Sequence, residues 1–214
     1  MAAEDGPMLV TAFRGPPTND RAPRTPTPRQ RELLQSIAEL FNTEGFRHLT
    51  LDDLASRLHC SKSILYRLAP SKDELVVTAL QWRSDVAREQ LERDIARAST
   101  AWGRVEAFVR SAQHYNGRYS TRLMADVMAV EHTRVLWDRG ALDYIRRVEA
   151  LISEGIGAGE FREVSPLMAG LVIGFMIDII RRGLATEVSA IASDDAYDSL
   201  LQFVHGALVP PNKA

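Results

Sequence analysis

Apolar residues recur at helical spacing from the point where a proline-rich N-terminal segment ends. Pro28 suits the first position of a helix, and Thr27 with Gln30 can form a capping box there. Gly45 stands where such a helix can stop. The pattern therefore predicts a first helix from residue 28 up to Gly45. Its apolar face consists of Leu33, Leu34, Ile37, Ala38 and Phe41.

Two short amphipathic helices are predicted next. The side chain of Thr50 can cap the first of them, and the side chain of Ser61 can cap the second, which ends at Pro70. The tripeptide His59-Cys60-Ser61 separates the two helices. Two short helices joined by such a turn form the outline of a helix-turn-helix.

A long fourth helix is predicted from residue 72 to about 98, and it should connect two domains. Further helices are predicted near 101–117, 121–130, 134–156, 166–182 and 194–208, separated by breaks such as Gly155 to Gly159. No segment alternates apolar and polar residues as a strand does. The predicted fold is all-α, with an N-terminal three-helix helix-turn-helix DNA-binding domain at residues 28–75 and a C-terminal helical-bundle domain for ligand binding and dimerisation at residues 76–214.

The segment from Pro166 to Ile180 is apolar nearly all round. Such a helix must be buried on every side or packed against another subunit, so we expect a homodimer formed through the helices near 166–182 and 194–208. Asp178 interrupts this apolar segment, and a carboxylate there must be paired, protonated or facing a cavity. An ion pair with Arg181, with Arg182 or with an arginine of a partner subunit is favoured over a ligand contact.

Composition narrows the picture. Residues 1–28 hold six of the ten prolines and show no apolar periodicity, so residues 1–27 are interpreted as a disordered arm. The formal net charge of -2 requires any DNA contact to come from a local basic cluster. A single cysteine, Cys60, fits a reducing cytoplasm. His59 and Cys60 are adjacent, but no further candidate ligand stands near them in the sequence, so a zinc site is not expected. With no membrane span or signal pattern, a cytoplasmic location is expected.

Four motifs occur in order across residues 29–75. They are Ala-Glu-Leu-Phe-Asn-Thr-Glu-Gly-Phe, Leu-Thr-Leu-Asp-Asp-Leu-Ala, Ser-Lys-Ser-Ile-Leu-Tyr and Pro-Ser-Lys-Asp-Glu-Leu. In this order and spacing the segment resembles the N-terminal domain of the TetR family of bacterial repressors. Three positions depart from the family pattern: His59 replaces a common Gly, Ser63 a common Gly or Ala, and Leu68 a common aromatic ring. The preferred DNA sequence therefore does not carry over.

The helix at 61–68 is predicted to read DNA, because a recognition helix presents its polar face to the major groove and packs its apolar face inward. Arg67 can reach a guanine edge through a bidentate contact, and Lys62 can reach a base or a phosphate. The resemblance implies that the positions holding the DNA backbone are Thr50, Ser61, Tyr66 and Lys72. The full set of predicted DNA-binding residues is Thr50, Ser61, Lys62, Ser63, Tyr66, Arg67 and Lys72.

Aromatic and methionine side chains on interior faces of the C-terminal helices are candidates for a pocket, since ligand sites commonly form between helices of a bundle. We expect a small-molecule effector with an apolar or aromatic body, and neither a cofactor nor a metal. The candidate ligand-binding residues are Trp102, Phe108, Tyr115, Tyr119, Met124, Met128, Trp137, Tyr144, Phe175 and Asp178.

The predicted function is a DNA-binding transcriptional regulator, a dimeric repressor that a small molecule releases from a palindromic double-stranded operator. A ligand that favours a different spacing of the two DNA-binding domains would lower DNA affinity. Three alternatives remain: an enzyme, an architectural DNA-binding protein without an effector, and a helical adaptor. The enzyme is disfavoured because the glycines at 155–159 follow a predicted helix rather than a strand and lack the sixth-position Gly of a dinucleotide loop.

Overall fold

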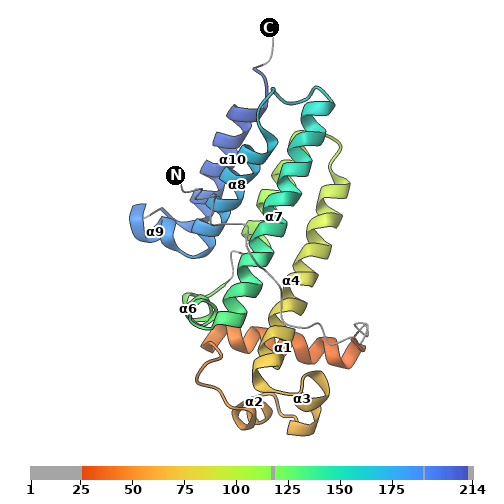
Figure 1. Ribbon diagram of the computed structural model, residues 1–214, viewed down its shortest axis with the longest axis vertical. Helices are drawn as coiled ribbons and strands as arrows, with labels where there is room; N and C mark the ends of the chain where they lie inside the picture. Colours follow the sequence, from red (N-terminus) through yellow and green to blue (C-terminus); the bar gives the residue numbers. More distant parts are fainter. Residues whose placement is uncertain (1–25, 117–118, 190, 212–214) are drawn as a thin grey trace, which may run out of the picture.

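A computed structural model describes residues 26–116, 119–189 and 191–211, except for the side chains of Tyr115 and Asn116. Regular structure in these ranges is helical throughout, which confirms the all-α prediction. The arm predicted at residues 1–27 lies almost wholly outside the described residues. Helices α1, α2 and α3 gather at one end of the molecule, and the longer helices α4 and α7 run away from them (Figure 1).

The helix-turn-helix consists of α2 (Leu51–Arg57) and α3 (Lys62–Leu68), preceded by α1 (Pro28–Glu44). The predicted capping box of Thr27 and Gln30 is present at the start of α1, and Thr50 forms a second one with Asp53 at the start of α2. His59, between α2 and α3, has a φ of 49°. Histidine thus adopts a left-handed conformation where the resembling family commonly has Gly, at some cost in backbone strain.

One apolar core holds these three helices together and extends beyond them. Its fully buried members include Phe41 of α1, Leu54 of α2 and Leu65 of α3. Leu75 and Ala79 at the start of α4 (Lys72–Arg97) belong to the same core. Two residues of α6 (Thr121–Ala129), Leu123 and Val127, complete it. The helix-turn-helix thus shares its core with two helices of the C-terminal domain.

A second core lies among the C-terminal helices α5 (Ala101–Ser111), α7 (Glu131–Gly157), α8 (Pro166–Arg181) and α10 (Ser193–Leu208). A π-helical turn at Ala112–Asn116 follows α5. The short helix α9 (Leu184–Ser189) was not predicted. It buries none of its residues, and Val188 is 88% exposed, so α9 has no apolar face for a periodicity search to find. No helix in the described ranges is long and apolar enough to cross a membrane.

Gly155 lies inside α7, so the prediction of a break beginning at this residue was wrong. The helix continues to Gly157 because Gly155 is buried and faces the ring of Phe161 and the Cβ of Ala101. A Cβ at Gly155 would overlap that ring. The glycine therefore permits close packing of the chain after α7 against the helix.

A Gly155→Ala substitution is expected to lower the free energy of unfolding by about 1–3 kcal/mol, because overpacking a filled core forces its neighbours to move. Gly157→Ala is the matched control, since a Cβ there meets nothing within 4 Å. Alanine is the better helix former, so this control should be neutral or slightly stabilising. Urea denaturation followed by circular dichroism measures both variants. Equal stability of the two would show that Phe161 moves aside freely.

Candidate nucleic-acid interface and ligand pocket

Helix α3 has one packed face and one exposed face. Leu65 is buried, and Ile64 and Leu68 are half-buried, as predicted for the inner face. Tyr66 is 52% exposed although it is a large aromatic residue. The exposed residues of the helix and its N-cap are Ser61, Lys62, Ser63, Tyr66 and Arg67. The sequence prediction therefore placed the polar face of α3 correctly.

Two polar side chains at the start of α3 already have partners. The Lys62 ammonium lies 2.5 Å from an Asp52 carboxylate oxygen of α2, and this hydrogen bond raises the pKa of Lys62. Ser61 occupies the N-cap position, but its hydroxyl lies 2.8 Å from that of Ser63 and makes no capping bond. The prediction that the Ser61 side chain caps α3 was therefore wrong, because a neighbouring hydroxyl competes with the backbone.

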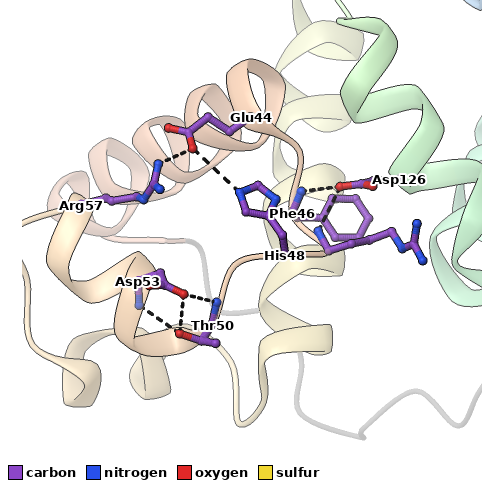
Figure 2. Close-up of polar contacts among 8 residues, drawn as sticks. Glu44, Phe46, His48, Thr50, Asp53, Arg57 and Asp126 are labelled. Carbon is purple, nitrogen blue, oxygen red and sulfur yellow. Dashed lines mark hydrogen bonds and ion pairs between the residues drawn. The ribbon is translucent and has the colours of Figure 1, made fainter.

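The other predicted DNA contacts lie at helix N-termini. The Thr50 hydroxyl accepts a hydrogen bond from the Asp53 N–H at 3.2 Å and donates one to the Asp53 carboxylate at 2.6 Å. The Thr50 backbone N–H also donates to this carboxylate, at 2.8 Å (Figure 2). The bonds from the hydroxyl and from the backbone N–H of Thr50 lower the pKa of Asp53. Lys72, at the start of α4, donates a hydrogen bond to the Arg47 carbonyl oxygen at 3.0 Å. Thr50 is thus fixed at the start of α2, and Lys72 is bonded to the loop that leads into this helix.

A carboxylate from the C-terminal domain holds the chain that follows α1. Asp126 of α6 accepts hydrogen bonds from the backbone N–H groups of Phe46 and Arg47, at 2.6 and 2.9 Å (Figure 2). Gly45 has a φ of 79°, and a Cβ there would collide with the Asp126 carboxylate. Sequence reasoning found Gly45 as a helix stop but missed Asp126, because nothing in the pattern joins residues 80 positions apart.

A pocket of about 200 Å³ lies between α4 and α7, and Val127 of α6 is part of its wall. Three of the predicted ligand-binding residues line it: Tyr119, Trp137 and Tyr144. The rings of Tyr119 and Trp137 meet edge to face with centroids 5.1 Å apart. Arg181, at the end of α8, also lines the pocket and was not among the predicted residues.

The remaining aromatic and methionine candidates are placed elsewhere. Phe108 and Met124 are buried in the cores, and Met128 packs against the core shared with the helix-turn-helix. Trp102 packs edge to face on His205, with centroids 4.7 Å apart. Phe175 is 57% exposed on α8, so it does not line an interior pocket of this chain. The side chain of Tyr115 lies outside the described residues.

Asp178 is paired, which is the interpretation that the sequence favoured. Its carboxylate lies 2.7 Å from Nε of Arg182 and 3.5 Å from Nη2 of Arg181. It also accepts a hydrogen bond from the indole N–H of Trp137 at 3.0 Å. One carboxylate therefore ties α7 to the C-terminal end of α8 and fixes the orientation of a ring that lines the pocket.

Large apolar side chains remain exposed on one part of the C-terminal domain, where α8 and α10 lie side by side (Figure 1). A shallow apolar groove runs between these two helices. We call these exposed side chains the α8–α10 face: Leu167, Met168, Val172, Phe175, Met176 and Phe203. Exposed apolar side chains that gather on one part of a protein commonly mark a site of interaction with another molecule.

The fold and the exposed face of α3 define a helix-turn-helix protein with a helical C-terminal domain. A family model for bacterial regulatory proteins of the tetR family matches residues 33–79. An uncharacterized HTH-type transcriptional regulator of Mycobacterium tuberculosis is 39% identical over 70 residues, which cover 33% of this chain and 33% of that protein. The chain thus matches about a third of the length of this relative.

Solved structures extend the likeness to the whole fold. A transcriptional regulator of Saccharomonospora viridis in complex with choline has a TM-score of 0.71 at 17% identity, covering 85% of this chain and 97% of that one. A TetR transcriptional regulator of Chloroflexus aurantiacus has a TM-score of 0.69 at 19% identity, covering 85% and 96%. Residues 33–79 thus match the tetR family of bacterial regulatory proteins, and the fold of the chain is similar to that of solved TetR regulators.

Proposed function

We propose that this protein is a dimeric repressor that binds a palindromic operator and is released from it by a small molecule. The observation that supports this most directly is α3, whose apolar side packs inward while its polar residues stay exposed. Arg67 would read a base edge, and Tyr66 would donate a hydrogen bond to a phosphate. Thr50, Ser61 and Lys72 would position the domain on the backbone.

The α8–α10 face would form the dimer interface. Two-fold symmetry would place the same helices of both subunits against each other and bury the exposed apolar side chains on each. The dimer would present two α3 helices to successive major grooves, roughly 34–36 Å apart along the duplex. An operator with two-fold symmetry follows from this arrangement.

The pocket between α4 and α7 would hold the effector. Five of its lining residues come from α4, which begins at Lys72 beside the helix-turn-helix. A ligand that moves α4 would change the spacing of the two α3 helices and lower operator affinity. The Saccharomonospora viridis relative is a precedent for small-molecule binding in this fold, since it was solved with choline.

Substitutions on α3 test the DNA-binding proposal. Arg67→Ala is expected to weaken operator binding about 5- to 150-fold, because a bidentate base contact contributes ~1–3 kcal/mol. Tyr66→Phe should weaken it about 2- to 10-fold by removing one phosphate hydrogen bond. Fluorescence anisotropy measures both variants, with DNA flanking the coding region or obtained by random-sequence selection, at two salt concentrations.

Arg134→Ala is the matched control, because Arg134 is an exposed arginine on α7, away from α3. Wild-type affinity should fall as the salt concentration rises. Failure to select any DNA sequence would overturn the repressor proposal and favour a helical adaptor. DNA binding that no small molecule alters would favour an architectural protein.

A further inference from the structure

Arg181 is a buried cation at the wall of the pocket. Its side chain is only 6% exposed, and its guanidinium lies over the Trp137 ring at 4.5 Å and near the Tyr144 ring at 5.7 Å from the centroids. The Nε atom is shielded from solvent and has no hydrogen-bond partner among the described residues. Its contact with Asp178, at 3.5 Å, is at the limit of a hydrogen bond.

Among the described residues, Asp178 is the only carboxylate that forms an ion pair with Arg181. Arg182 lies closer to Asp178, at 2.7 Å, and also pairs with Asp138 at 3.9 Å. Of the acidic residues that line the pocket, Asp85 and Asp143 are both exposed, and Asp143 pairs with Arg88 at 3.6 Å. A buried guanidinium that shares one carboxylate is costly unless another acceptor reaches it.

The aromatic side chains of the pocket are already occupied by cations of the protein. Arg83 lies over the ring of Tyr119 at 4.4 Å, and Arg181 takes the face of Trp137. A cationic ligand such as choline would have to compete with these guanidinium groups for the same rings and would meet their charge. The pocket therefore suits an anion better than a quaternary ammonium ion.

The size of the pocket limits the ligand further. Its volume of about 200 Å³ is similar to that of an apolar cavity of roughly 150 Å³ that takes up benzene. One ring with a carboxyl group fills such a space. The planar guanidinium also matches the geometry of a carboxylate, which can accept two parallel hydrogen bonds from it.

From these observations we infer that the effector of this protein is a monocyclic aromatic carboxylate whose carboxylate pairs with Arg181. The inference rests on the proposed effector pocket and adds the chemical class of its ligand. The ring lies among Tyr119, Trp137 and Tyr144, and the carboxylate supplies the acceptor that Arg181 lacks.

Three ligands of similar size test the inference on the free, full-length protein: benzoate, benzamide and benzyltrimethylammonium. Titration calorimetry should give a dissociation constant for benzoate at least tenfold lower than for benzamide, with the ammonium ion binding no better than benzamide. Benzamide or the ammonium ion binding as tightly as benzoate would overturn the inference. So would the absence of benzoate binding.

Arg181→Gln should abolish the preference for benzoate, whereas Arg139→Gln, at an exposed arginine of the same pocket, should keep it. A preference that survives Arg181→Gln would overturn the role of Arg181. Circular dichroism checks that the variants fold, and the three-ligand comparison needs no variant. These titrations contain no DNA. If benzoate does not bind, the DNA-binding part of the repressor proposal is unaffected. If the protein does not bind DNA, the titrations still test the ligand class.

Discussion

A Phe175→Glu substitution is expected to convert the proposed dimer into monomers. Phe175 is 57% exposed in the single chain, at the centre of α8, so we expect it to be buried when two α8–α10 faces meet. Burial of one phenylalanine contributes ~1.5–3 kcal/mol. Two-fold symmetry introduces the substitution twice, so the dimer loses roughly 3–6 kcal/mol, or about 10²- to 10⁴-fold in its dissociation constant. Two unpaired carboxylates add to this loss.

Sedimentation velocity at several protein concentrations measures the effect. Leu142→Glu is the control, because Leu142 is an exposed apolar residue on α7 outside the α8–α10 face. We expect the control to stay dimeric and the Phe175 variant to lose high-affinity operator binding together with the dimer, since a monomer contacts only one half-site. If the Phe175→Glu protein remained a dimer, the dimer interface would lie on a surface other than the α8–α10 face.

An Asp126→Ala substitution is expected to loosen the DNA-binding domain from the C-terminal domain. It leaves the N–H groups of Phe46 and Arg47 without their acceptor, the first of them part-buried. A hydrogen bond to a charged group contributes ~1.5–3 kcal/mol, but the exposed Arg47 N–H can bond to water instead, so we expect the free energy of unfolding to fall by about 2–4 kcal/mol. For a chain of this size that corresponds to a Tm about 4–16 °C lower.

Operator affinity should fall as well, because the loop that Asp126 holds leads directly into Thr50 and α2. Glu106→Ala is the control, since the ion pair of this carboxylate with Arg110, at 3.9 Å, is the only one that it forms with the described residues. Differential scanning calorimetry and anisotropy measure the two effects. If Asp126→Ala kept the wild-type Tm and the wild-type operator affinity, the shared apolar core alone would be enough to join the two domains.

Periodicity predicted the elements that have a continuous apolar face, and it failed where packing depends on distant residues. The capping box at Thr27 and the stop at Gly45 were both predicted from local signals, and the structure confirms them. Each depends on residues within one turn of the helix. The role of Gly155 was missed because the residue it packs against, Phe161, lies beyond the end of the helix, where no local signal points to it.

The candidate site divides in the same way. The exposed face of α3 follows from helical spacing, so the sequence predicted it correctly. The pocket is formed by residues of α4, α7 and α8 together. The sequence predicted only its aromatic residues, because aromatic side chains with a polar group on an apolar helix face are candidates for a ligand site. Arg181 was considered only as a partner of Asp178. The sequence offered Arg181 and Arg182 as alternative partners, and the structure shows that both pair with this carboxylate.

The ion pair between Lys62 and Asp52 affects how this domain would move along DNA. A free lysine that reaches a phosphate releases a condensed counterion into solution, and this release drives non-specific binding. Lys62 instead pairs with the carboxylate of Asp52 on α2, 2.5 Å away. If a phosphate replaced Asp52 as the partner of Lys62, this carboxylate would remain beside the duplex and would not be released into solution. Lys62 therefore adds little to attraction toward arbitrary DNA. The share of Lys62 in the salt dependence of DNA binding would be smaller than that of a lysine without such a partner.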